Sequence, residues 1–339
     1  MLLKKLSEAF GPSGYEHEVR TILEEELKDY VGVWQRDALG NLIACKEAAK
    51  GPRVMLAAHM DEVGLMISHV DDAGLLHFHK VGGIDDRVLV SKPVLVGKNR
   101  VPGVIGAKAI HLQRPEERTQ VIPHRSLFID IGAKSKDEAL AKVKLGDYVI
   151  FATEYGEFGE GLAKGKALDD RAGCFVLAEA LKEEYNFPLY GAFTVQEEIG
   201  LRGAGVAAYA IEPDLGIVIE GTTCNDVSGM EEHEYSTVLG GGPAITFMDT
   251  ASIGNRAMIQ ELVRIAEENN IPYQFKGTVT GGNDAGRINV SRAGVPVVAI
   301  SIPCRYIHSP VSVLSLEDVR NTTKLIKLFL RSIEGGFRV

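Results

Sequence analysis

The chain has 339 residues, of which 45% are hydrophobic and 24% charged, and its formal net charge at pH 7 is −9. This length suits two domains, the composition excludes disordered and fibrous chains, and the acidic balance argues against a nucleic-acid partner. No apolar run reaches the roughly eighteen residues that a membrane helix needs. The N-terminus also lacks the apolar region of a signal peptide, so we expect a cytoplasmic protein with no membrane partner.

Helical and strand patterns alternate at both ends of the chain. Near the N-terminus we expect a helix over 15–30, two short strands around the turn at 39–41, and a buried strand over 54–58. After residue 165 we expect strands around 189–195, 214–219, 243–247, 273–276 and 295–302, and helices over 171–184, 254–269 and 316–332. Runs that are apolar at every position are typical of strands covered on both faces. The expected fold class is α/β, with a mostly parallel sheet and helices on both faces.

The middle of the chain has a different pattern. From about residue 64 to residue 155, short apolar segments are broken by Gly, Pro and Asp, and one helix is expected over 135–140. Short strands at such close spacing indicate a small β-barrel. We therefore predict an α/β domain over 1–65 and 156–339, with a small β-barrel domain inserted at 66–155.

Histidines and acidic residues follow the expected strands of the α/β domain. His59 follows VMLAA, Glu197 and Glu198 follow GAFTV, Glu220 follows LGIVI, and His308 comes shortly after VPVVAISIP. Because the carboxyl ends of parallel strands share one edge of a sheet, these side chains are expected to meet there. Asp169, in the segment KALDDRAG just before an expected helix, belongs to the same edge.

Each of these residues has an ordinary structural explanation when it is taken alone. A histidine after a strand is commonly a surface residue, Asp169 or Asp170 suits a helix N-cap, and Glu197–Glu198 suits a solvated turn. Their coincidence at one edge favours a metal site.

Two imidazoles with three or four carboxylates suit two divalent ions better than a single zinc ion. One carboxylate would bridge the ions, which would share a water. In the pair Glu197–Glu198, one side chain would bind metal and its neighbour would take a proton from that water. Asp61, two residues after His59, would hold the other ring nitrogen of a histidine, and we place it with the catalytic residues. Such ligands suit Zn²⁺, Co²⁺ or Mn²⁺.

Six segments together resemble the glutamyl-aminopeptidase and tetrahedral-aminopeptidase family of two-metal exopeptidases, some of which carry endoglucanase names. These segments are AAHMDEVG, KALDDRAGC, FTVQEEIGLRGA, IVIEGTT, GGNDAG and YIHSP, and the resemblance covers nearly the whole chain. It implies that His59 and His308 are terminal ligands, that Asp169 bridges the metals, that Glu198 and Glu220 are the remaining ligands, and that Glu197 is the general base.

The resemblance implies a metal-dependent aminopeptidase that removes N-terminal residues from short peptides through a metal-bridging water activated by Glu197. Its cofactors would be two divalent ions per subunit, Zn²⁺ or Co²⁺, with Mn²⁺ as a third option. A homo-oligomer is implied as well: a dimer through the inserted domain, or a dodecamer built from such dimers.

The motifs depart from the family pattern at two positions. Glu220 stands where Asp is common, and Asn283 stands where we expect Thr. The longer Glu220 side chain can still reach a metal, but its mode of binding is left open.

Other functions are weighed against this one. The nearest is a two-metal carboxypeptidase or deacylase, although the motif segments offer only Arg171 and Arg202 as partners for a C-terminal carboxylate. A glycoside hydrolase would need two facing carboxylates without metal and usually aromatic platforms, whereas the single tryptophan, Trp34, lies far from the motifs. A non-catalytic binding module would not need a base beside a ligand. The histidines of the inserted domain are assigned no metal, and no substrate-binding residue is assigned.

Overall fold

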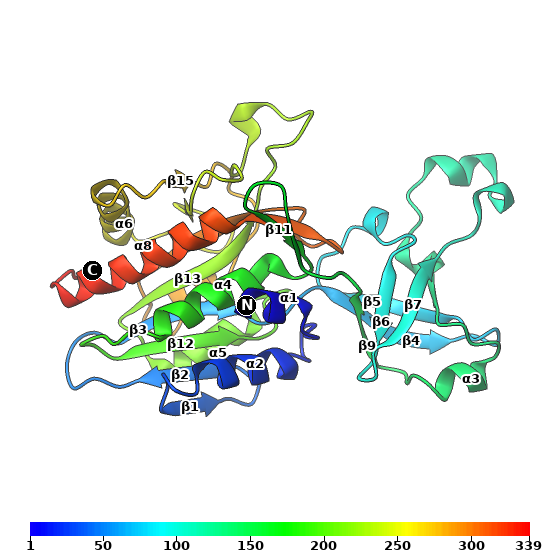
Figure 1. The fold of residues 1–339 in the computed structure, drawn as a ribbon, viewed down its shortest axis with the longest axis horizontal. Coiled ribbons are helices and arrows are strands. Elements are labelled where there is room, and N and C mark those ends of the chain that lie inside the picture. The colour runs from blue at the N-terminus through cyan, green and yellow to red at the C-terminus, as the bar shows by residue number, and fades with distance from the viewer.

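A computed structural model describes residues 1–339 and divides them into a large mixed sheet with helices and a separate closed barrel (Figure 1). The expected α/β fold with an inserted β-barrel is confirmed. None of the helices combines the length and the apolarity that crossing a membrane would require.

The large sheet has nine strands along its main path. In spatial order they are β1 (Val33–Arg36), β2 (Leu42–Lys46), β12 (Leu189–Thr194), β3 (Val54–His59), β13 (Leu215–Thr223), β16 (Val297–Arg305), β17 (Ser312–Ser315), β11 (Leu162–Gly165) and β10 (Gly156–Phe158). Two short strands, β14 (Ala244–Ile245) and β15 (Gln274–Phe275), attach beside β16. The four central strands, β12, β3, β13 and β16, are mutually parallel, and the strands that flank them are antiparallel.

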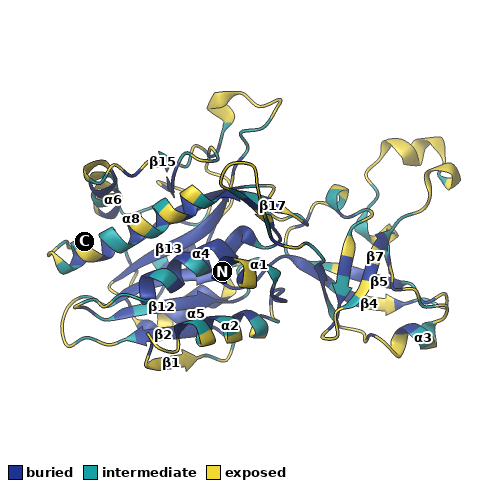
Figure 2. Ribbon diagram, in the orientation of Figure 1, coloured by how far each residue is buried: buried dark blue, intermediate teal, exposed yellow.

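Helices cover both faces of this sheet. They are α1 (Leu2–Glu8), α2 (His17–Leu27), α4 (Leu168–Leu181), α5 (Arg202–Ile211), α6 (Arg256–Glu268), α7 (Ala285–Asn289) and α8 (Leu316–Glu334). Alternate residues of a strand point to opposite faces, and β3 shows the result. Leu56 packs into the core formed with α1, α2, α4, α6 and α8, whereas Met55 and Ala57 pack into the core formed with α5 and α7. Every residue of β3 is therefore buried (Figure 2).

The inserted barrel has its own hydrophobic core. Its strands are β4 (Gly64–Val70), β5 (Leu76–Val81), β6 (Pro93–Val96), β7 (Val101–Gly106), β8 (Phe128–Asp130) and β9 (Tyr148–Phe151), and they close in the order β4-β5-β8-β7-β6-β9. The short helix α3 (Lys136–Leu140) is capped by Ser135, whose hydroxyl accepts a hydrogen bond from the Glu138 amide. The segment between β7 and β8 is largely exposed (Figure 2).

Several smaller elements of the structure were not predicted from the sequence. Helix α5 follows the Glu197–Glu198 turn, and the strands β10, β11 and β17 extend the sheet on one flank. The buried stripe of α5 consists of glycine and alanine apart from Ile211 at its end, so few large apolar side chains mark this helix in the sequence RGAGVAAYAI. Gly203 needs this smallness, because a Cβ there would lie 2.4 Å from the Val195 carbonyl oxygen.

Candidate metal centre

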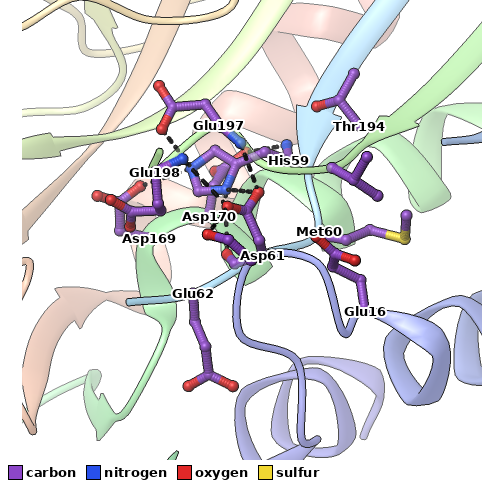
Figure 3. A network of polar contacts seen from close by, with 12 residues as sticks. Glu16, His59, Met60, Asp61, Glu62, Asp169, Asp170, Thr194, Glu197 and Glu198 are labelled. Atoms are coloured by element: carbon purple, nitrogen blue, oxygen red, sulfur yellow. Dashed lines mark hydrogen bonds and ion pairs between the residues drawn. The ribbon is translucent and has the colours of Figure 1, made fainter. Parts of the chain in front are cut away.

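The acidic and histidine residues predicted from the strand ends lie together at one edge of the sheet. Figure 3 shows four of them, His59, Asp169, Glu197 and Glu198. His59 is the last residue of β3, Glu197 and Glu198 lie in the turn after β12, Glu220 lies within β13, and His308 lies in the turn after β16. Asp169 precedes the regular part of α4, since Asp169 and Asp170 have non-helical φ and ψ. Asp170 caps this helix by accepting a hydrogen bond from the Gly173 amide at 3.0 Å.

The first group of potential ligands consists of His59, Asp169 and Glu220. The His59 Nε2 atom lies 3.1 Å from Glu220 Oε1 and 3.4 Å from Asp169 Oδ1. All three residues are buried, and their ligand atoms lie within 4.8 Å of one another. This spacing suits three ligands around one ion.

The second group consists of Asp169, Glu198 and His308. The His308 Nε2 atom lies 3.2 Å from Glu198 Oε2 and 3.5 Å from Asp169 Oδ2. Asp169 therefore belongs to both groups and faces one histidine with each carboxylate oxygen. A carboxylate in this position can bridge two ions.

Two buried oxygens in the cluster lack a hydrogen-bond donor. Asp169 Oδ1 and Glu220 Oε2 are buried atoms without any hydrogen-bond partner. A buried carboxylate oxygen without a donor is costly, and a divalent cation would satisfy it. The residues present therefore fit divalent metal ions.

The clustered charges shift the acid–base behaviour of the proposed ligands. Burial, reinforced by the neighbouring carboxylates, raises the pKa values of Glu198 and Glu220 to about 8, although nearby histidines oppose the shift. Burial alone would lower the pKa of His308, but Asp169 and Glu198 outweigh it and raise the pKa to about 9. The same balance raises the pKa of His59 well above its usual value, with Glu220 as the main opposing charge. Without metal, these shifts favour the protonated forms of Glu198, Glu220, His59 and His308.

Asp61 is buried beside the proposed ligands and holds several of them in position. His59 Nδ1 lies 3.1 Å from its hydrogen-bond partner, the Asp61 backbone carbonyl, and 3.4 Å from Asp61 Oδ1, so the His59 Nε2 atom faces Asp169 and Glu220. Asp61 also accepts hydrogen bonds from the amides of Glu197 at 2.9 Å and Glu198 at 3.1 Å. Ser13, in a loop that we had not linked to the site, donates its hydroxyl to Asp61 at 2.6 Å. Asp61 thus orients His59 mainly through its backbone carbonyl, and the turn that carries both glutamates through its carboxylate.

Glu197 and Glu198 have different partners although they are adjacent in sequence. Glu198 contacts His308, whereas the closest ion-pair contact of Glu197 is 4.0 Å, from its Oε2 atom to His59 Nε2. Glu197 lines a cavity of about 420 Å³ together with His59, Asp169, Glu220 and His308. Burial, together with the charges of Glu220, Asp284 and Glu198, raises the pKa of Glu197 to about 11. Of the two adjacent glutamates, Glu197 is the one that lines this cavity.

The glycine-rich segment over 281–284 forms part of the cavity wall. Gly281, Gly282 and Asn283 line the cavity, and the Asn283 side chain donates to Asp249 at 3.1 Å. Asp284 is buried behind the wall and accepts a hydrogen bond from the Thr194 hydroxyl at 2.6 Å.

Neither arginine of the motif segments faces the cavity. Arg171 is fully buried and donates to the Met60 carbonyl at 2.8 Å and to Glu62 at 3.2 Å. Arg202 begins α5, is exposed, and lies outside the cavity lining. Arg171 therefore holds the backbone that follows His59 and pairs with Glu62.

A buried ion cluster beside the site was not foreseen. Glu62 accepts from Lys166 at 2.7 Å and from Arg171, and all three side chains are almost fully buried. Its members lie close in sequence to His59 and Asp169, but no strand-end pattern marks them. The histidines of the inserted domain lie elsewhere, in β4, β5 and the segments over 110–112 and 124–126.

Known proteins match almost the entire chain. The model of the family described as M42 glutamyl aminopeptidase matches residues 40–325. The lysyl aminopeptidase of Pyrococcus furiosus is 34% identical over 341 residues, which cover 98% of this chain and 97% of that protein. A TET aminopeptidase structure from a marine sediment Thaumarchaeota archaeon has a TM-score of 0.95 at 39% identity and covers 99% of this chain and 98% of its own.

A second similar structure belongs to a protein that forms large assemblies. The TET1 peptidase of Pyrococcus horikoshii, which can assemble into a tetrahedron or a large octahedral shell, has a TM-score of 0.85 at 37% identity. The match covers 96% of this chain and 97% of that one. As its motifs predicted, the chain belongs to the M42 glutamyl aminopeptidase family, whose members are metal-dependent aminopeptidases.

Proposed function

We propose that the chain is a two-metal aminopeptidase that removes single residues from the N-terminus of short peptides. The observation that carries the proposal is the pair of three-ligand groups that share Asp169. His59 and Glu220 would complete one metal site, Glu198 and His308 would complete the other, and Asp169 would bridge them. The ligand types suit Zn²⁺ or Co²⁺, with Mn²⁺ as a third option.

Glu197 is the proposed general base. Divalent ions bound in this centre would polarise the scissile carbonyl and make a shared water more acidic. The positive charge of the bound ions would favour the ionised form of Glu197, which would then accept the proton of that water and pass it to the leaving amine. Asp61 would keep the Glu197–Glu198 turn and the His59 ring in place, because it bonds to all three.

The charges around the cavity favour a free N-terminus. A substrate α-ammonium would enter a cavity rich in carboxylates, which include Glu197 and Glu220. Recognition of a C-terminal carboxylate typically uses a bidentate arginine fork, and no arginine lines this cavity. The cavity has one lysine, Lys276, which offers a single ammonium.

A substrate panel tests the proposal. The protein is stripped with a chelator, reloaded with Zn²⁺, Co²⁺ or Mn²⁺, and assayed on aminoacyl chromogenic amides while bound metal is quantified. We expect activity only after reloading, with two ions bound per chain. Full activity of the stripped protein would contradict a metal mechanism.

Blocked peptides test the direction of attack. Peptides with an acetylated N-terminus should be cut poorly, while amidation of the C-terminus should matter little. Equal rates on acetylated and free peptides, or activity lost on C-terminal amidation, would favour a deacylase or carboxypeptidase instead.

We further propose that the chain forms a homo-oligomer in which the barrel makes the dimer contact. The assembly of the TET1 relative supports this, and Figure 1 places the barrel to one side of the α/β part. Replacing residues 66–155 by a short linker should give a smaller species in light scattering. A truncated protein that kept the full assembly would contradict the role of the barrel.

A further inference from the structure

The loop over 11–16, between α1 and α2, contacts both the α/β part and the barrel. On the side of the α/β part, the Glu62 amide donates to the Gly11 carbonyl at 3.0 Å. The Ser13 hydroxyl donates to Asp61 Oδ2 at 2.6 Å, and both side chains are almost fully buried. The loop therefore ends behind the carboxylate that holds the turn after β12.

The same loop packs against two strands of the barrel. The Tyr15 ring lies 5.4 Å, centroid to centroid, from the ring of Tyr148, the first residue of β9. A Cβ atom on Gly14 would lie 2.9 Å from the Tyr148 hydroxyl oxygen. A Cβ atom on Gly64, at the start of β4, would lie 3.2 Å from Pro12 Cγ. These contacts leave little room between the loop and the barrel, so the barrel restrains the loop.

The Ser13 hydroxyl completes the hydrogen bonds of the Asp61 carboxylate. Oδ2 accepts from Ser13 and from the Glu198 amide, while Oδ1 accepts from the Glu197 amide. Without the Ser13 hydroxyl, the carboxylate could rotate with less resistance, and the turn that is bonded to it would shift. A displacement of about 1 Å in a reacting group can cost roughly 100-fold in rate.

We propose that Ser13 is a positioning residue for the general base, and that the barrel holds Ser13 in place through Tyr148. The proposal rests on the proposed function and gives the barrel a role in turnover besides its role in assembly. The Tyr148 ring restrains the loop, the loop aims the Ser13 hydroxyl at Asp61, and Asp61 holds the turn that carries Glu197. A change in the barrel should thus alter turnover without touching a metal ligand.

Ser13→Ala tests the contact with Asp61. The metal-loaded variant and the wild type are compared on aminoacyl p-nitroanilides, at a metal concentration that gives both the same bound metal. We expect kcat to fall by roughly 10- to 100-fold, while KM changes by less than about twofold because Ser13 does not line the cavity. The visible absorption bands of bound Co²⁺ report the geometry of its ligands. They should also shift, since the Glu198 amide bonds to the same Asp61 oxygen.

A matched serine controls for the loss of a buried hydroxyl. Ser7 is fully buried on α1, and its hydroxyl donates to the Lys166 carbonyl at 2.7 Å. Ser7→Ala should lower the melting temperature as Ser13→Ala does, but it should leave kcat and the Co²⁺ bands unchanged. If Ser13→Ala does not fold, Ser13→Cys replaces it and should show a smaller fall in kcat, because a thiol is a weaker donor.

A double-mutant cycle tests the path from the barrel. Tyr148→Leu removes the ring beside the loop but keeps an apolar side chain in β9, and it should lower kcat by roughly 3- to 10-fold. In the Ser13→Ala background the same substitution should have almost no further effect, because the hydroxyl that it would displace is already absent. Phe128→Leu is the control and should leave kcat unchanged. Phe128 is half-buried against Gly106 on β8, which lies opposite β9 in the closed barrel.

The outcomes separate the proposal from the function on which it rests. A loaded wild-type protein that cleaves none of the amides contradicts the proposed aminopeptidase, while the Co²⁺ bands of Ser13→Ala still decide the role of Ser13. Wild-type kcat and unchanged bands in loaded Ser13→Ala overturn the role of Ser13. Independent, multiplicative effects of Ser13→Ala and Tyr148→Leu overturn the path from the barrel alone.

Discussion

Glu197 and Glu198 show how two adjacent residues acquire different chemistry. Both amides donate to Asp61, which fixes the turn, while one carboxylate contacts His308 and the other faces the cavity. A general base must be close to the centre without serving as a ligand, and Glu197 meets that condition.

Glu197→Gln should therefore separate metal binding from turnover. The amide keeps the shape of the side chain but accepts a proton poorly, so kcat should fall by roughly 10²–10⁴. Metal content and melting temperature should stay near wild type. Glu198→Gln is the matched control, because it should lose metal as well as activity. Near-normal turnover in fully loaded Glu197→Gln would exclude this base.

The shifted pKa values make metal binding compete with protons. Glu198 and Glu220, with pKa values raised to about 8, are mostly protonated at pH 7 without metal, although a ligand must be ionised. Metal affinity should rise between pH 6 and pH 9, and binding should release protons, which calorimetry in buffers of different ionisation enthalpy detects. An affinity that is constant across this range would contradict these shifts.

The same shifts predict the stability of the metal-free protein. A carboxyl group with a raised pKa binds more protons in the folded protein than in the unfolded protein. Its contribution to the free energy of unfolding therefore falls as the pH rises through the folded-state pKa. The pKa of His308 is raised to about 9, so its contribution to the free energy of unfolding also falls as the pH rises toward 9. The melting temperature of the stripped protein should therefore fall from pH 6 to pH 9, whereas that of the metal-loaded protein should fall less.

Much of the site could be predicted from the sequence at the level of residues. His59, Glu197, Glu198, Glu220 and His308 could be grouped because buried parallel strands deliver them to one edge, and the structure brings them together. Ser13 could not be found in this way. Its hydroxyl reaches Asp61 from a loop 48 positions earlier, and a single serine in a Gly-Pro turn carries no periodic signal.

At the scale of elements, the Glu62–Lys166–Arg171 cluster joins the segments that carry His59 and Asp169. Glu62 accepts from the Gly11 amide and from Lys166, and Lys166 also donates to the Ala9 carbonyl at 2.6 Å. The end of β3, the start of α4 and the loop after α1 thus meet at one buried carboxylate. This cluster was missed because charged residues near strand ends are usually solvated.

Glu62→Gln should destabilise the protein strongly. It would leave two buried cations without a counter-charge, which typically costs about 3–5 kcal/mol. The urea midpoint should fall. Metal affinity should also weaken, because the Glu62 carboxylate would no longer join the segments that carry His59 and Asp169. Glu25→Gln, which breaks the exposed pair with Lys28, is the control and should leave the midpoint unchanged. If the urea midpoint of Glu62→Gln equalled that of the control, the buried cluster would contribute nothing to stability.

The elements that the sequence predicted best are those with long, uniform patterns. The strand β3 and the helices α2 and α8 have continuous apolar runs or clear stripes, and they appear near their expected limits. The antiparallel flank of β17, β11 and β10 depends on pairing between distant segments, such as Leu162 with Ser315, which no local pattern encodes.

At the scale of the molecule, bound metal should stabilise the fold of the α/β part, because the proposed ligands come from distant segments of the chain. These five ligands are His59, Asp169, Glu198, Glu220 and His308. A ligand that binds only the folded state stabilises it by mass action. Chelation should lower the melting temperature, and reloading should restore it. An unchanged melting curve after verified metal removal would contradict these five residues as ligands.

The position of His308 has a consequence for synthesis. The elements β17 and α8 follow it, and α8 contributes Leu325, Phe329 and other residues to the main core. Domains tend to fold as their chains emerge, with N-terminal parts first. The barrel, which contains no proposed ligand, can fold early, but the proposed second metal site also needs the segment that follows β16. A growing chain of this protein would therefore lack one of its proposed metal ligands until residue 308 has been synthesised, long after the barrel has emerged.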